Sequence, residues 1–255
     1  MSAALQLDDL AIRFGGVQAV AGVSFAVEEG DFVGLIGPNG AGKTTLIKIV
    51  AGLLRPDRGK IALGGVDVTR DATAARVRRG LALTHQIVRP FRDMTVLDNV
   101  VLGAGIDRTA NPFRAMLHVD RRRESARAAD IIGQVGLAGT ERKLAGSLPL
   151  GQMKRLELAR ALAVDPSIIL LDEPLAGLNH TEASRQVETI SDVHQRGITV
   201  ILVEHNLEEV MRICRRLIVL NNGLVIGDGA PREVMADPVV HEAYVGSGMV
   251  AHAQA

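Results

Sequence analysis

Residues 37–44 read Gly-Pro-Asn-Gly-Ala-Gly-Lys-Thr, which fits the phosphate-binding pattern G-x-x-x-x-G-K-[ST]. Glycines at these positions let consecutive backbone N–H groups curl around a polyphosphate without interference from Cβ atoms. Lys43 is then expected to reach the β- and γ-phosphates, and the Thr44 hydroxyl to ligate Mg²⁺. The alternative interpretation is a glycine-rich turn that matches the pattern by accident.

The flanking segments favour phosphate binding over that alternative. Residues 31–36 have the apolar character of a buried strand entering the loop, and residues 43–50 have the pattern of a helix leaving it. The N-terminus of such a helix points at a bound anion. The sequence therefore predicts a nucleotide site whose contacts come from Gly37, Pro38, Asn39, Gly40, Ala41, Gly42, Lys43, Thr44 and Thr45.

Composition limits the remaining possibilities. A chain of 255 residues, 47% of them hydrophobic, makes one large domain or two small ones with a sizeable core. Lys and Arg together number 29, as do Asp and Glu, so the formal net charge is zero. With only 2% aromatic residues as well, the chain lacks both a basic field and a base-stacking platform, and no nucleic-acid partner is expected. A run of three arginines at 121–123 is interpreted as a solvated helix start, with a local nucleic-acid contact as the alternative.

The cysteine content and the lengths of the apolar segments indicate the cellular location of the chain. Cys214 is the only cysteine, so it cannot form an internal disulfide, and we expect it to fill the core. The N-terminus shows no charged region followed by an apolar stretch, and no uncharged run approaches the roughly 18 residues of a membrane helix. We therefore expect a chain that is cytoplasmic or held at a membrane by partners.

The pattern of elements predicts an α/β fold. Several short antiparallel strands are expected in the first 30 residues, where Gly15-Gly16 and Gly22 interrupt the alternation. Further strands are expected at 60–63, 81–84, 168–171, 199–203 and 217–220. Long helices are expected to join the last three of these. The sequence Asn221-Asn222-Gly223 predicts a hairpin turn into 224–227.

A change of period marks a helical insert at about 87–163. Helices are predicted over 96–102, 121–135 and 149–163, the last with Pro149 at its first helical position. The whole chain, 1–255, is thus predicted to be one domain. It combines a P-loop NTPase core, an N-terminal antiparallel β-subdomain, an inserted α-helical subdomain and a C-terminal tail from about 229.

A second chemical signal lies at 168–174, which reads Ile-Ile-Leu-Leu-Asp-Glu-Pro. Ligands bind at the carboxyl ends of parallel strands, where Asp172 is placed to hold Mg²⁺ through water and Glu173 to polarise the attacking water. The alternative is an ordinary acidic strand end. His205 follows the next predicted strand and is expected near the γ-phosphate, although a lone histidine there is usually structural. Gln86, at the join of the two lobes, is a predicted γ-phosphate sensor and Mg²⁺ ligand.

Together these residues resemble the nucleotide-binding subunit of an ATP-binding cassette (ABC) transporter over nearly the whole chain. The resemblance covers the P-loop, Gln86, the Asp172-Glu173 pair and His205, and it adds Phe14 as the aromatic that stacks on adenine. Residues 147–163 resemble the family's signature segment, and 176–179 its D-loop. The resemblance implies ATP and Mg²⁺ as cofactors and a head-to-tail dimer with a second ATPase subunit. Each ATP would lie between one P-loop and the other subunit's signature residues, Leu148, Pro149, Leu150, Gly151 and Gln152.

Three segments narrow the resemblance to importers of the branched-chain amino-acid group: residues 13–20, the signature Leu-Pro-Leu-Gly-Gln and the tail at 229–246. That group implies ATP hydrolysis at the cytoplasmic face of the membrane, transmembrane permease subunits near 86–91 and an extracytoplasmic substrate-binding protein. The sequence departs from the group at His85, usually Phe, and from the commonest family signature at Pro149 and Leu150.

Two other classes of protein are alternatives to this resemblance. A soluble non-transport ABC ATPase, such as a repair or assembly scaffold, would use the same site. The absence of long coiled-coil heptads and of a second cassette argues against the repair and translation-factor types. A P-loop GTPase is disfavoured because no Asn-Lys-x-Asp motif occurs.

Overall fold

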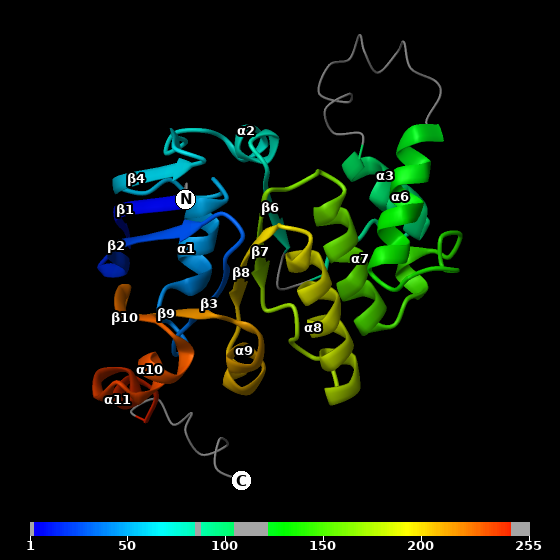
Figure 1. Ribbon diagram of the computed structural model, residues 1–255. Helices are drawn as coiled ribbons and strands as arrows, with labels where there is room; N and C mark the ends of the chain where they lie inside the picture. The colour runs from blue at the N-terminus through cyan, green and yellow to red at the C-terminus, as the bar shows by residue number, and fades with distance from the viewer. Residues whose placement is uncertain (1–2, 85–87, 105–121, 246–255) are drawn as a thin grey trace.

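The computed structural model describes residues 3–84, 88–104 and 122–245, and its strands form two sheets. The smaller sheet is antiparallel, in the order β2-β1-β4-β5, and lies at one side of the molecule (Figure 1). Its strands are β1 (Ala3–Phe14), β2 (Val17–Glu28), β4 (Arg58–Leu63) and β5 (Val66–Asp67).

The larger sheet carries the predicted site. Its order is β10-β9-β3-β8-β7-β6, and all its neighbours are parallel except β10, which pairs antiparallel with β9. Buried parallel strands read as continuous apolar runs, as β7 and β8 do. The strands are β3 (Phe32–Ile36), β6 (Leu81–Thr84), β7 (Ile168–Asp172), β8 (Thr199–Val203), β9 (Arg216–Asn221) and β10 (Leu224–Gly229).

Helix α1 (Lys43–Val50), which follows the P-loop, packs between the two sheets. Its Leu46 and Ile49 belong to the same buried cluster as Leu5 of the small sheet and Val33 of the large one. Arg76, buried on α2 (Thr73–Arg78), closes the far end of α1: its Nη1 donates to the carbonyls of Ile49 and Val50, both at 2.8 Å. These carbonyls have no partner within a helix, and a cation there also favours the helix dipole.

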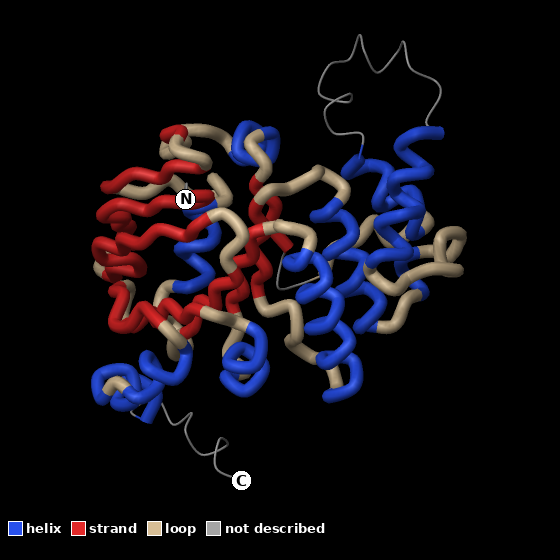
Figure 2. The backbone as a smooth tube through the Cα atoms, in the orientation of Figure 1, coloured by secondary structure: helices blue, strands red, loops and turns tan. Residues whose placement is uncertain are grey.

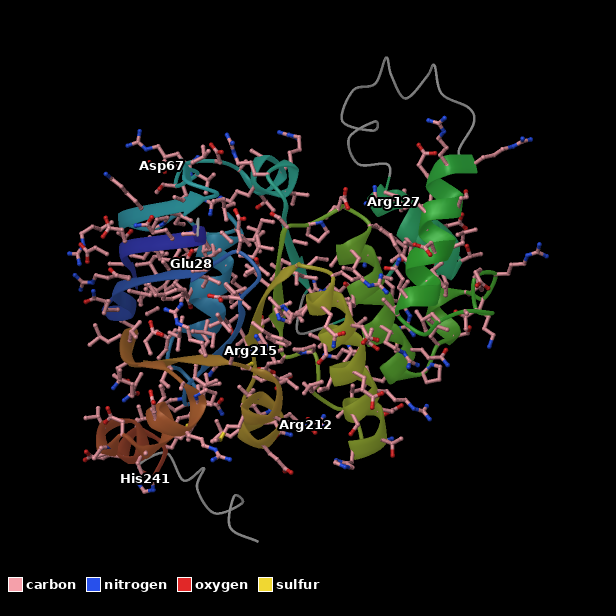
Figure 3. All side chains as sticks on the ribbon, in the orientation of Figure 1. Glu28, Asp67, Arg127, Arg212, Arg215 and His241 are labelled. Atoms are coloured by element: carbon pink, nitrogen blue, oxygen red, sulfur yellow. The ribbon has the colours of Figure 1, made fainter. Side chains whose placement is uncertain are left out.

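The remaining helices cover the other face of the large sheet: most stand to the right of the strands, and the C-terminal helices lie below them (Figure 2). A second buried cluster joins that sheet to α3, α6 and α7 of the helical region. In Figure 3, Asp67 and Arg127 mark the two opposite sides, the small sheet and α6. The helices are α3 (Val96–Ala104), α6 (Arg122–Gln134), the short 3₁₀ helix η1 (Ala145–Ser147), α7 (Leu150–Leu162), α8 (His180–Gln195), α9 (Leu207–Ile213), α10 (Pro231–Ala236) and α11 (Pro238–Val245).

Within the described ranges, no helix has both the length and the apolar character that crossing a membrane requires.

The predicted fold class is confirmed, and three local expectations are wrong. The first 30 residues form two 12-residue strands instead of several short ones, because Gly22 sits in an irregular stretch of β2 that bends the strand without ending it. Helix α9 has only seven residues, not the expected long helix. Pro149 is the N-cap of α7, with extended ψ, so the helix begins one residue later than predicted.

Cys214 lies in the core, as predicted. Its side chain packs in the second cluster, and burial raises the pKa of its thiol to about 12. The thiol is thus protonated at neutral pH, as expected of a structural cysteine.

Candidate functional site

The register of three parallel strands brings the predicted residues to one edge of the large sheet. Leu35 of β3 pairs with Val203 of β8, and Val203 also pairs with Asp172 of β7. These three residues therefore lie on one rung. The P-loop, Glu173 and His205 each begin one or two residues beyond that rung, so the order β3-β8-β7 gathers them at the carboxyl ends of the strands.

Two glycines let the P-loop pack closely against its neighbours. Gly37 has φ 149° and Gly42 has φ 102°, both in the region that favours glycine. A Cβ on Gly37 would lie 2.1 Å from the carbonyl oxygen of Leu220, and a Cβ on Gly42 would lie 2.3 Å from that of Ala19. Packing of the loop against β9 and β2 therefore requires glycine at these two positions, in addition to any requirement of phosphate binding.

The β9–β10 hairpin turn holds this loop against β2. The Gly223 amide donates to the carbonyl of Ala41 at 3.0 Å, and the Gly223 carbonyl accepts from the amide of Ala21 at 2.8 Å. Asn222, in the same turn, has φ 47°, as the predicted hairpin requires. The turn thus forms part of the site, and its Asn222 lines the pocket over the P-loop.

The Lys43 side chain is buried and bound to its own loop. Its Nζ donates to the carbonyls of Gly37 at 2.6 Å and Pro38 at 3.1 Å. Burial lowers the pKa of Lys43, while the carboxylates of Glu173 and Asp172 act in the opposite direction. The ammonium group therefore lies in the electrostatic field of Asp172, the last residue of β7, and of Glu173, which follows it.

A pocket of about 310 Å³ opens over the loop. Glu173 shares it with loop residues 39–45, so two sequence signals some 130 residues apart line one cavity. Its lining consists of Val17, Gln18, Ala19, Asn39, Gly40, Ala41, Gly42, Lys43, Thr44, Thr45, Glu173 and Asn222.

Sequence reasoning missed four of these lining residues: Val17, Gln18, Ala19 and Asn222. The turn sequences at 15–16 and 221–223 predicted bends, but only tertiary hydrogen bonds bring both bends to the P-loop. Phe14, predicted to bind adenine, is 49% exposed and lies beside the pocket, where it pairs with Val17 across the β1–β2 turn.

Glu173 adopts an unusual backbone conformation at the mouth of the pocket. Its φ is 49°, and its amide donates to the carbonyl of Val203 at 2.9 Å. One carboxylate oxygen, Oε1, lies 3.8 Å from Nδ1 of His205, which is about half exposed. A carboxylate and a histidine therefore lie close together at neighbouring strand ends.

The donor set suits Mg²⁺ bound together with a nucleotide. Thr44 offers a hydroxyl and the buried Asp172 offers a carboxylate, both hard oxygen ligands of the kind that Mg²⁺ takes alongside phosphate oxygens and water. In the described part of the chain, no cluster of three or more His, Cys, Asp or Glu side chains forms a metal cage. Gln86, the third predicted ligand, lies outside the described residues.

The signature residues 148–152 are not brought into this pocket. Leu148 packs in the core, whereas Pro149 and Leu150 are exposed at the start of α7. Gly151 is buried against α8. A Cβ at this position would lie only 3.0 Å from Oε1 of Glu182. The segment is a helix start that contributes no residue to the lining of the chain's own P-loop pocket.

Comparison with known proteins identifies the family to which the chain belongs. The sequence profile of the ABC transporter family matches residues 20–176. The chain is 36% identical over 248 residues to the high-affinity branched-chain amino acid transport ATP-binding protein BraF of Pseudomonas aeruginosa, covering 95% of this chain and 97% of that one. It is 35% identical over 242 residues to the lipopolysaccharide export system ATP-binding protein LptB of Haemophilus influenzae, with the same shares covered.

A solved structure agrees with the sequence comparisons. The ADP conformation of an ATP-binding cassette of an ABC transporter superposes with a TM-score of 0.85 at 32% identity, over 96% of this chain and 99% of that one. The chain belongs to the ABC transporter family, as an ATP-binding cassette subunit. It binds ATP, and it is an ATPase.

The packing of the loop predicts that two neighbouring glycines differ in their tolerance of a methyl group. Gly40 and Gly42 both have positive φ, but only at Gly42 would a Cβ meet another atom within 4 Å. Gly40→Ala should cost about 1–3 kcal/mol of backbone strain. Gly42→Ala should lower the unfolding midpoint further and weaken ATP binding at least tenfold, because the loop must move away from β2. Thermal unfolding and calorimetry test this, and equal effects of the two variants would contradict it.

Proposed function

We propose that the chain is the ATP-hydrolysing subunit of a bacterial importer of branched-chain or related amino acids, bound at the cytoplasmic face of the membrane. BraF and LivG, the latter from Salmonella typhimurium, are both named for branched-chain amino acid transport and are 36% identical to the chain over 248 residues. LptB is nearly as similar, as is a sulfate/thiosulfate import protein from Chromobacterium violaceum at 36% identity. Overall identity thus does not select the substrate, and the proposal depends on residues 13–20, the signature and the tail segment.

The observation that carries the catalytic part is the meeting of Lys43, Glu173 and His205 at one edge of the sheet. Glu173 lines the pocket, and we assign it as the base that takes a proton from the attacking water. Lys43 exchanges its loop carbonyls for phosphate oxygens, and His205 holds the γ-phosphate beside Glu173. Thr44 and Asp172 would hold Mg²⁺, which would supply positive charge to neutralise the phosphates.

A dimer completes the site in this proposal. The first N–H groups of α7 have no partner within the helix, and they lie at the positive end of its dipole. Presented to the ATP of a second subunit, Leu150, Gly151 and Gln152 would bind its phosphates through their backbone. Pro149 offers neither a hydroxyl nor an N–H, so its share of that contact is missing.

Permease subunits are proposed to contact the surface that follows Gln86. Phe91 is 50% exposed there, and the guanidinium of Arg160 lies 5.2 Å from its ring centre. Leu102 and Leu144 add further exposed apolar side chains from the same helical region. An extracytoplasmic binding protein would deliver the substrate to those permeases, without contact with this chain.

Replacement of the proposed base should separate binding from turnover. Glu173→Gln should retain ATP affinity and lower the steady-state ATPase rate about 10²-fold or more, because general-base help is lost. Lys43→Ala is the matched control: it should weaken ATP binding about tenfold or more, since a charge-assisted contact is removed. Near-normal turnover in Glu173→Gln would remove Glu173 from the role of base.

The signature proline predicts weak dimerisation of the isolated subunit. In sedimentation experiments with ATP, Glu173→Gln alone should dimerise weakly, and adding Pro149→Ser should strengthen the dimer, because the serine restores one hydroxyl and one N–H donor. Pro149→Ala, which restores the N–H alone, separates the two contributions. A tight dimer without the serine, no tighter with it, would contradict the assignment.

Uptake experiments test the transported compound. Cells that lack the chain should lose high-affinity uptake of labelled leucine, isoleucine or valine. The unaltered chain should restore uptake and Glu173→Gln should not. Labelled sulfate serves as the control. Normal uptake of all three amino acids, with loss of sulfate uptake, would refute amino-acid import while leaving the ATPase assignment intact.

A further inference from the structure

The loop after β7 is held by hydrogen bonds on both sides of Glu173. The Glu173 amide donates to Val203, and the Glu173 carbonyl accepts from Nζ of Lys154 at 2.9 Å. Two residues further on, the Leu175 amide donates to Oε1 of Glu204 at 2.8 Å. Pro174 between them has no N–H. Two ionisable side chains thus fix the backbone that carries the proposed base.

This fixation coincides with backbone strain. Glu173 has φ 49°, in a left-handed region that non-glycine residues seldom occupy. Such a conformation persists when its surroundings over-determine it. The Glu173 carbonyl also accepts from the Ala176 amide, at 3.3 Å. The strained conformation is therefore held by contacts from outside the loop as well as within it.

The side chains of Lys154 and Glu204 are both buried. Lys154 is 5% exposed on the second turn of α7, and Glu204 is 1% exposed directly after β8. Burial lowers the pKa of Lys154, against which Glu204 acts first, followed by Glu173, Asp172 and Glu157. Burial also raises the pKa of Glu204. The Glu204 carboxylate therefore favours the charged form of Lys154, which burial disfavours.

The same two side chains reach the other site residues. The second oxygen of Glu204, Oε2, accepts from the backbone amide of His205 at 3.3 Å and lies 4.0 Å from its Nδ1. Lys154 lies within the first two turns of the helix that begins at the signature segment. The pair therefore connects the start of α7, the Glu173 loop and the histidine strand.

We propose that Lys154 and Glu204 are positioning residues for ATP hydrolysis, which clamp the loop 173–175 so that the Glu173 carboxylate faces the pocket. The proposal rests on the role of Glu173 as base. Neither side chain lines the pocket over the P-loop, so the pair acts on the rate of hydrolysis and not on ATP binding.

The test compares ATP turnover with ATP affinity in the purified full chain. Lys154→Met should lower kcat about tenfold, because misplacement of a reacting group by about an ångström is costly. Its ATP affinity, measured by calorimetry with EDTA present, should change less than about twofold. Lys154→Arg keeps the cationic donor and should recover kcat to within about threefold of the unaltered chain. Lys60→Met, on the exposed face of β4, is the matched control and should leave both quantities unchanged.

Measurements in the Glu173→Gln variant distinguish failure of this proposal from failure of the role of Glu173 as base. In Glu173→Gln, Lys154→Met should lower the residual turnover by less than about twofold, because no base remains to be positioned. Undiminished turnover in Glu173→Gln itself would refute the base. A normal Glu173 effect with an unchanged kcat in Lys154→Met would refute only the clamp.

A purely structural role is distinguished by stability and by a milder variant. Parallel losses of thermal stability, ATP affinity and kcat, without recovery in Lys154→Arg, would overturn the proposal. If Lys154→Met does not fold, Glu204→Gln gives the answer: the variant is isosteric, but its neutral amide oxygen accepts more weakly from the Leu175 amide than the carboxylate does. That variant should lower kcat at least about threefold at unchanged ATP affinity, and an unchanged kcat would overturn the clamp.

Discussion

The pairing of β8 between β3 and β7 is the constraint on which the site depends. The rung of Leu35, Val203 and Asp172 fixes how far each strand extends toward the edge, and the loops that follow carry the phosphate-binding, acidic and histidine residues. A slip of register by one residue would reverse the faces of a strand and move its last side chain away from the pocket. The continuous apolar runs of β7 and β8, buried on both faces, stabilise that register.

Around this edge, tertiary contacts set the shape of each loop. The P-loop packs closely against β2, β9 and the β9–β10 turn. A Cβ on Gly37 or Gly42 would therefore clash with a backbone carbonyl of a neighbouring strand. On the other side, Lys154 and Glu204 fix the loop of Glu173. Helix α1 is meanwhile held between two sheets and capped by Arg76. The chemistry thus sits where several independent elements meet.

The sequence predicted those parts of the site that are local. Residues 37–44 and 168–173 each contain strand, loop and chemical group within a few positions, so their spacing alone indicates phosphate binding and acid–base chemistry. It did not predict Ala19 or Asn222 in the pocket wall, because two distant turns meet only in the folded chain. Lys154 and Glu204 read as ordinary charged residues, since their burial comes from packing between α7 and the strand ends. The expected long helix after β8 was wrong for a related reason: the chain needs only α9, seven residues, to return from β8 to β9.

The central claim is that this edge of the sheet is one ATP site, and a structure of the Glu173→Gln chain with Mg²⁺ and ATP tests it most directly. In the structure, Nζ of Lys43 donates to the carbonyls of Gly37 and Pro38. We expect its Nζ to leave them for the β- and γ-phosphates, with Mg²⁺ between Thr44 and Asp172 and the γ-phosphate beside His205. ATP bound elsewhere, or in this pocket with Lys43 still on its loop carbonyls, would contradict the account.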